Sequence, residues 1–113
     1  MALTLWHNPR CSKSRAALAL LRDRGVEPDL RLYLKSPPIE AELVELLRRL
    51  GIPAIGLVRT REPVFQELGL ADADDTALIA AMAAHPILIE RPIIDDGTRA
   101  VIGRPPENVL ALI

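Results

Sequence analysis

The order of short apolar runs and longer helical segments constrains the fold of this chain more than any other feature. Residues 2–6 form a short apolar run that predicts a buried strand. Residues 12–24 then carry apolar positions at helical spacing, and Gly25 supplies the end of that helix. Residues 30–34 alternate leucine with arginine and tyrosine, which predicts a second strand. The first third of the chain is therefore expected to form a strand–helix–strand unit.

The middle of the chain predicts helices. Three segments combine apolar residues at helical spacing with proline or aspartate at the start, and glycine follows the first two. The predicted helices cover residues 37–50, 63–68 and 74–84. Asp74 or Asp75 is the expected N-cap of the third helix, and His85 is expected to close it. Residues 52–61 are expected to be irregular.

The C-terminal part predicts a hairpin and a last helix. Two apolar runs, at residues 87–94 and 99–102, flank the turn sequence Asp95-Asp96-Gly97-Thr98. A proline pair at residues 105–106 then starts the last helix. The complete string is β-α-β, a helical insertion, then β-β-α. It predicts an α/β, thioredoxin-like domain over residues 1–113, with a mixed four-stranded sheet flanked by helices.

Composition excludes several classes of function. The formal net charge is −1, so a general attraction to nucleic acid or to membranes is not expected. A single cysteine excludes an internal disulfide framework and any zinc site built on several thiolates, and we expect no metal. The N-terminus is too short and too polar for a signal peptide, and no apolar run is long enough to span a membrane. A reducing, cytoplasmic location is expected.

The one cysteine, Cys11, falls where the first predicted strand gives way to the first predicted helix. Unpaired backbone N–H groups and the helix dipole favour a thiolate over a thiol at that position. Arg10, Lys13 and Arg15 add positive charge in the neighbouring sequence. The alternative is a buried, inert cysteine, a common fate for this residue. The polar and basic surroundings favour thiolate chemistry.

The residue three places after Cys11 is Ser14, so the motif is Cys-x-x-Ser rather than Cys-x-x-Cys. No second thiol in the chain can break a mixed disulfide or another adduct on Cys11. An external thiol must do so, and glutathione and glutaredoxin are the candidates. A phosphatase-like loop would need an arginine six residues after the cysteine, but that residue is Ala17, which excludes it.

Three arginines occur in settings that suit anion binding. Arg59 lies in an irregular segment, Arg91 precedes Pro92 at a strand start, and Arg104 follows the last strand. The planar guanidinium donates paired hydrogen bonds to tetrahedral oxyanions. One such arginine alone is more often a solvated surface charge, but three on loops and strand ends, in a chain with one activated thiol, favour an oxyanion site. Thioredoxin-like folds place a cis proline facing the thiol, and Pro92 is the candidate for it in this chain.

His7 precedes the cysteine by four residues and leaves three alternatives open. It can lower the pKa of the thiol, orient a polar network, or cap the end of the first strand.

With the thiol and the arginines in view, the chain resembles the glutaredoxin-coupled arsenate reductases from Leu5 to Ile113. The resemblance rests on the blocks HNPRCSKSR, YLKSPP, LVRTREPVFQELGL, HPILIERPII and GRPPENVLAL. The resemblance implies that Cys11 is the nucleophile. It also implies that Arg59, Arg91 and Arg104 bind the oxyanion. It also implies that His7 and Ser14 tune the thiol. Arg61 is a rival for the role of Arg59.

The chemistry that the resemblance implies is covalent. The Cys11 thiolate attacks arsenate, glutathione attacks the adduct, and glutaredoxin removes the glutathione so that arsenite can leave. No metal or tightly bound organic cofactor is implied, and glutathione is a co-substrate. Two alternatives remain. Spx-type transcription regulators share the fold and bind RNA polymerase, many of them through a Cys-x-x-Cys switch that is absent here. A glutathione-dependent thiol reductase with another substrate also fits.

Overall fold

The computed structural model describes residues 2–113, which divide into two compact units. The first unit comprises the chain up to Ser36 together with Arg91–Ile113, and the second comprises Pro37–Glu90. The first unit contains the predicted β-α-β and β-β-α parts, and the second contains the predicted helical insertion. That residues 1–113 act as a single domain stays a prediction.

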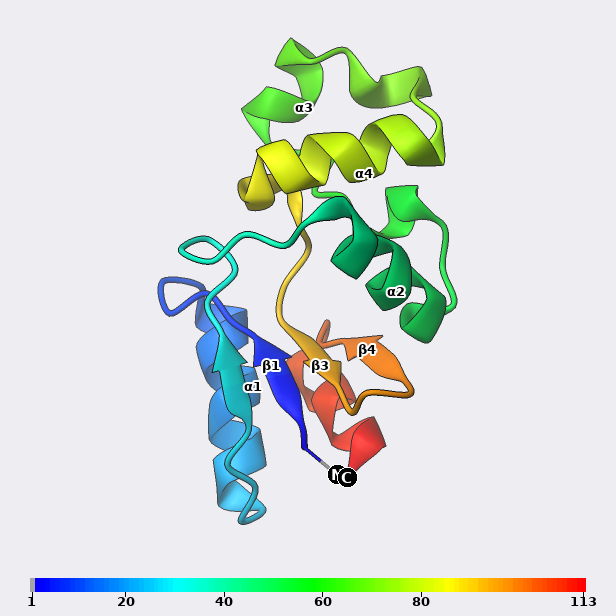
Figure 1. The fold of residues 1–113 in the computed structure, drawn as a ribbon. Helices are drawn as coiled ribbons and strands as arrows, with labels where there is room; N and C mark the ends of the chain where they lie inside the picture. Colours follow the sequence, from blue (N-terminus) through cyan, green and yellow to red (C-terminus); the bar gives the residue numbers. More distant parts are fainter. Residues whose placement is uncertain (1) are drawn as a thin grey trace. The chain divides into compact units, whose positions relative to one another are not determined.

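The first unit is built on a four-stranded mixed sheet (Figure 1). The strands are β1 (Thr4–Trp6), β2 (Asp29–Arg31), β3 (Ile93–Asp95) and β4 (Ala100–Ile102), in the order β2-β1-β3-β4. β1 and β2 run parallel, whereas the β1–β3 and β3–β4 pairs are antiparallel. The predicted thioredoxin-like class, with its mixed sheet flanked by helices, is confirmed.

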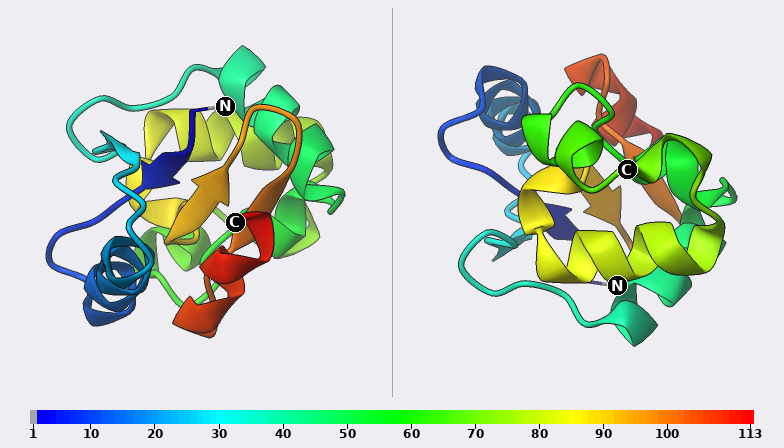
Figure 2. Two further views of the ribbon diagram at one scale, coloured as in Figure 1. Left: turned by 90° about the horizontal axis from the view of Figure 1, so that it is seen from below. Right: turned by 90° about the horizontal axis from the view of Figure 1, so that it is seen from above.

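Two helices cover one face of this sheet side by side, α1 (Ser12–Asp23) and the 3-10 helix η4 (Pro106–Leu112) (Figure 2). The strand register places Leu5 opposite Ile94, and Ile94 opposite Val101, so one row of side chains faces these helices. Leu5 and Ile94 are completely buried, and each contributes roughly 1.5–3 kcal/mol by leaving water. This core packs Ala17, Leu18 and Leu21 of α1 against β1 and β3.

The predicted hairpin between β3 and β4 is confirmed. The carboxylate of Asp96 accepts hydrogen bonds from the backbone N–H groups of Thr98, at 2.8 Å, and Arg99, at 2.7 Å. Gly97 has a φ of 92°, a conformation that side chains rarely allow. Local turn chemistry therefore sets the hairpin, as the Asp-Gly pair indicates.

The second predicted strand is shorter than expected. β2 ends at Arg31, because the N–H groups of Lys35 and Ser36 both turn back to the carbonyl of Leu32. The buried side chain in this stretch is Tyr33, whereas Leu30 and Leu34 are 42% and 41% exposed. The predicted strand over residues 30–34 is therefore wrong in its second half, because the chain leaves the sheet after Arg31.

The predicted strand over residues 87–94 is also wrong in its first half. Pro86–Leu88 form a 3-10 helix, η3, and Ile89 makes only an isolated bridge to Val58. Pairing in the sheet begins at Ile93, directly after Pro92, which has no N–H to donate to a neighbouring strand. Proline therefore separates two apolar runs that look continuous in the sequence.

The second unit is helical. Its elements are α2 (Glu40–Leu50), η1 (Ala54–Leu57), α3 (Pro63–Glu67), η2 (Leu70–Asp72), α4 (Asp75–Ala84) and η3. α2 begins after the proline pair and ends at Gly51, whose φ of 67° suits glycine. Asp74 caps α4 by accepting the N–H of Ala77 at 2.8 Å, and His85 closes the helix as predicted.

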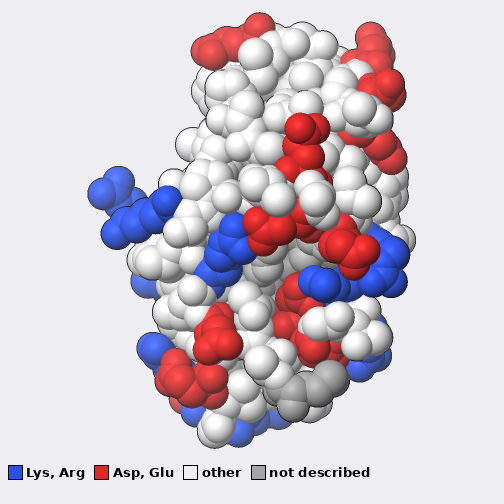
Figure 3. All heavy atoms as spheres, in the orientation of Figure 1, with Lys and Arg blue, Asp and Glu red and all other residues white. Residues whose placement is uncertain are grey.

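On the face seen in Figure 3, the charged side chains at the top are acidic, whereas both signs occur in the middle and lower parts. The formal net charge of the chain is −1. In residues 2–113 no helix is long and apolar enough to cross a membrane. The same part of the chain holds no group of three or more His, Cys, Asp or Glu side chains arranged to bind a metal ion.

Candidate functional site

Cys11 is the N-cap residue of α1, as the sequence predicts. Its backbone is extended, with φ −92° and ψ 122°, and its carbonyl accepts the N–H of Arg15 at 3.0 Å. Its own N–H donates to the carbonyl of Asn8 at 3.0 Å, which closes the turn between β1 and the helix. The thiol makes no capping hydrogen bond and is only partly buried. It is thus held at the helix N-terminus with access to solvent.

The surroundings of Cys11 favour the thiolate. Burial by itself raises the pKa of the thiol, but the backbone N–H of Ser14 and the charge of Arg91 lower it. The backbone N–H of Lys13 and the charge of Arg104 lower the pKa further, and the result lies below the ordinary value for cysteine. The backbone N–H groups at the helix N-terminus therefore lower the pKa of Cys11, as predicted. Among charged side chains, Arg91 and Arg104 are the ones that lower this pKa. The side chains of Arg10, Lys13 and Arg15 are exposed.

Arg91 and Arg104 are joined to each other. The Nε–H of Arg104 donates to the carbonyl of Arg91 at 2.9 Å, and both side chains are half-buried. Each arginine precedes a cis proline, Pro92 and Pro105 respectively. The cis form of Pro92 agrees with the prediction, whereas the cis form of Pro105 was not expected. The start of β3 and the end of β4 thus present two tethered guanidinium groups on the unit that carries the thiol.

Gly103 packs closely against Pro92, which precedes β3, and against Val109 of η4. A Cβ added there would lie 2.8 Å from Pro92 Cγ and 2.8 Å from Val109 Cγ1. The N–H of Gly103 donates to the Pro92 carbonyl at 2.8 Å. Sequence reasoning did not single this residue out, although a glycine between a predicted strand and Arg104 is the kind of signal that marks a close backbone contact.

His7 and Ser14 form a buried polar pair behind the thiol. His7 Nδ1 lies 2.6 Å from Ser14 Oγ, and the N–H of Asn8 also donates to that oxygen, at 3.1 Å. Burial, followed by the charges of Arg22 and Arg15, lowers the pKa of His7, which favours the neutral imidazole. His7 reaches the thiol through Ser14, whose N–H stabilises the thiolate. Of the three predicted roles for His7, this geometry matches the orientation of a polar network.

Arg59 lies in the second unit, where both its backbone and its side chain make contacts. Its N–H donates to the Leu88 carbonyl at 2.7 Å, and its Nη1 lies 2.7 Å from a carboxylate oxygen of Glu62. Arg59 is partly buried, whereas its rival Arg61 is exposed. The structure brings Cys11, Arg91 and Arg104 together within one unit. The convergence of Arg59 or Arg61 with them stays a prediction.

Known proteins resemble this chain over nearly its whole length. The sequence profile of the ArsC family matches residues 6–112. The chain is 44% identical over 114 residues to the arsenate reductase of Neisseria meningitidis serogroup A, covering 98% of this chain and 97% of that protein. It is 49% identical over 112 residues to the uncharacterized protein YfgD of Escherichia coli, covering 96% and 94%. The structure of arsenate reductase from Vibrio cholerae matches with a TM-score of 0.96 and 45% identity, covering 100% and 98%.

The family profile includes the segments that contain His7, Cys11, Arg91 and Arg104. Both chains of each pair are matched almost end to end, so the similarity extends beyond the sheet and its helices. The chain therefore belongs to the ArsC family.

Proposed function

We propose that this protein reduces arsenate to arsenite, with Cys11 as the nucleophile. Membership of the ArsC family and the arsenate reductases among its relatives support the substrate. The observation that carries the proposal is the partly exposed thiol of Cys11 with a lowered pKa, to which Arg91 and Arg104 contribute. A thiolate and two guanidinium groups on one unit suit attack on a tetrahedral oxyanion.

In the first step the arginines hold arsenate while the thiolate attacks arsenic. A sulfur–arsenic bond forms, and one oxygen of arsenate leaves as water after protonation. Arg91 and Arg104 offset the negative charge of the oxyanion that would otherwise repel the thiolate. Arg59 is the proposed third binder, and to reach the anion its guanidinium must share or leave the carboxylate of Glu62.

Two electrons then have to come from thiols outside the chain, since Cys11 is its one cysteine. The thiol of glutathione displaces a second oxygen as water and bonds to arsenic. A glutaredoxin thiolate attacks the glutathione sulfur, and the electron pair of the broken sulfur–arsenic bond stays on arsenic. Arsenic is thereby reduced from As(V) to As(III), and glutaredoxin and glutathione form a mixed disulfide. Hydrolysis of the Cys11–arsenic bond releases arsenite and returns the thiolate.

The scheme uses no metal and no bound organic cofactor, and its thiols require the reducing conditions of a cytoplasm. Ser14 and His7 are proposed to tune the thiol, because Ser14 donates its N–H to the thiolate and its hydroxyl bonds to His7.

The test is arsenate-dependent oxidation of NADPH with glutathione, glutathione reductase and glutaredoxin. We expect turnover that needs all components and disappears in Cys11→Ser. Turnover with thioredoxin and thioredoxin reductase but not with glutaredoxin would support the arsenate reductase activity. It would overturn the proposed coupling to glutathione and glutaredoxin. No arsenate reduction with either system, together with capture of RNA polymerase by the protein, would favour the regulator instead.

A further inference from the structure

A hollow of about 380 Å³ adjoins the loop that leads from β1 to Cys11. Residues 7–10 form one wall, and Leu32, Leu34 and Lys35 from the turn after β2 form the other. Its volume is within the range of small-molecule sites. Arg10 lines the hollow and directly precedes Cys11, so the hollow reaches to within one residue of the thiol. All of its lining residues belong to the first unit.

Two cations lie at this hollow, Arg10 and Lys35, and both side chains are exposed. In the described part of the chain neither head group takes part in an ion pair. Pro9, Leu32 and Leu34 supply apolar walls between them, and Leu34 is 41% exposed. A complementary ligand has two negative groups joined by an aliphatic chain.

A second hollow of about 470 Å³ lies on the other side of the same loop, against α1, and it lacks these properties. Its two arginines are already engaged. Arg22 donates to both carboxylate oxygens of Glu27 at 3.0–3.2 Å, and Arg15 donates to the Pro9 carbonyl at 2.9 Å. Asp23 adds a negative charge to its wall. The comparison favours the first hollow as the anion site.

We propose that the hollow lined by Arg10 and Lys35 is the binding site for glutathione. The two cations pair with its two carboxylates, and Leu32 and Leu34 contact the methylene groups of its γ-glutamyl residue. An extended tripeptide spans about 10 Å, so its central thiol can reach Cys11 while the carboxylates stay in the hollow. This inference rests on the proposed function, in which glutathione is the reductant.

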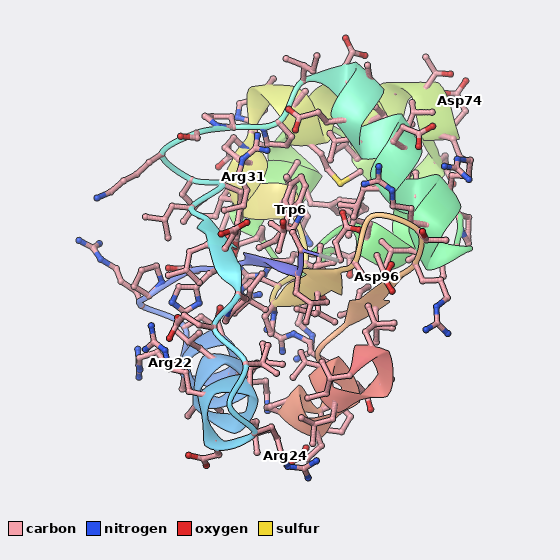
Figure 4. The ribbon with its side chains drawn as sticks, turned by 60° about the horizontal axis from the view of Figure 1, so that its bottom comes forward. Trp6, Arg22, Arg24, Arg31, Asp74 and Asp96 are labelled. Carbon is pink, nitrogen blue, oxygen red and sulfur yellow. The ribbon has the colours of Figure 1, made fainter. Side chains whose placement is uncertain are left out.

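Binding is tested on the wild-type protein by NMR titration with S-methylglutathione, which cannot react with the thiol. We expect shifts confined to residues 7–11 and 32–35, including Cys11 because the methylated sulfur should lie beside it. Exposed ion pairs are weak, so Arg10→Ala and Lys35→Ala should each raise the Kd about two- to fivefold. Arg24→Ala is the matched control, because it removes one exposed charge at the far end of α1, where Figure 4 shows Arg24. It should leave the Kd unchanged.

Kinetics supply the second test. Arg10→Ala and Lys35→Ala should raise the KM for glutathione by the same factors while kcat and the KM for arsenate stay unchanged. With 2-mercaptoethanol, a neutral thiol, the variants should match the wild type. Glutathione esterified at its glycine carboxylate should lose sensitivity to one of the two substitutions and keep sensitivity to the other.

Shifts located outside these residues, or an unchanged Kd in both variants, would overturn the inference. An equal rise in the KM for 2-mercaptoethanol in these variants would also overturn it, since it would show a general effect on the reactivity of Cys11. Binding of S-methylglutathione in the hollow without arsenate turnover would overturn the proposed function and leave the inference standing. The two substitutions lie at exposed, separate positions, so either variant decides the question if the other fails to fold.

Discussion

The imidazole of His7 and the hydroxyl of Ser14 are joined by a 2.6 Å hydrogen bond, and the two residues are 4% and 0% exposed. The bond joins the end of β1 to the first turn of α1, across the loop that contains Cys11. Ser14 also accepts the N–H of Asn8 and donates its own N–H to the thiolate. This one serine therefore connects the conformation of the loop with the chemistry of the thiol.

Replacement of Ser14 by alanine should destabilise the fold. The change leaves the His7 ring nitrogen and the Asn8 N–H without their partner in the protein interior, which costs about 1–3 kcal/mol. Urea denaturation measures the loss. Ser12→Ala is the matched control, because Ser12 is exposed in the same turn, and it should cost less than about 0.5 kcal/mol. Equal stability of both variants would contradict the role given to Ser14.

The pH dependence of stability should report His7. Its pKa is lowered in the folded protein from 6.5, so the unfolded chain binds a proton more readily at acid pH. The contribution of neutral His7 to the free energy of unfolding is fully present above pH 6.5. It is lost as the pH falls from 6.5 toward the lower pKa of His7 in the folded protein. The free energy of unfolding, measured between pH 8 and pH 5, should fall less steeply in His7→Asn than in the wild type.

Cys11 should titrate below an ordinary cysteine. The pH dependence of iodoacetamide alkylation gives the pKa, and a midpoint near the usual value of about 8.5 would contradict the prediction. Arg91→Ala and Arg104→Ala should each raise the midpoint, because each removes a charge that stabilises the thiolate. Arg10→Ala should shift it less than either, since Arg10 is exposed.

Cys11→Ser should abolish arsenate reduction and keep the fold. Serine at an N-cap accepts a backbone hydrogen bond that the thiol does not make, so the variant should be as stable as the wild type or up to about 1 kcal/mol more stable. The coupled assay and thermal denaturation measure the two effects. Activity close to the wild-type value would place the chemistry on another residue.

The arginines give the sharpest test of the oxyanion site. Charge-assisted hydrogen bonds are worth roughly 1.5–3 kcal/mol, so alanine at any of Arg59, Arg91 or Arg104 should lower kcat/KM for arsenate about ten- to a hundredfold. Lysine should restore only part of the loss, because it lacks the planar fork. Arg61→Ala is the internal control and should be mild. If Arg61→Ala is the damaging change and Arg59→Ala is silent, Arg61 takes the site role.

Features that depend on a few neighbouring residues could be predicted from the sequence. Cys11 lies at the start of a helix, Asp74 caps another, and the Asp-Gly turn joins β3 to β4, each through hydrogen bonds that span two to four residues. The order of the elements and the mixed sheet followed from those local signals. For the same reason the lone thiol at a helix N-terminus could be identified as a candidate reactive group.

Features that depend on distant segments were decided by the tertiary structure. β2 ends before its leucine alternation does, so Leu30 and Leu34 are exposed and Tyr33 is buried. The charges of Arg91 and Arg104, which lower the thiol pKa, come from residues eighty or more positions away in the chain. The hydrogen bond from Arg104 to Arg91 and the space left by Gly103 hold that pair. Sequence spacing indicates only local geometry. The electrostatic field at Cys11 depends on which strand ends the fold places near the thiol.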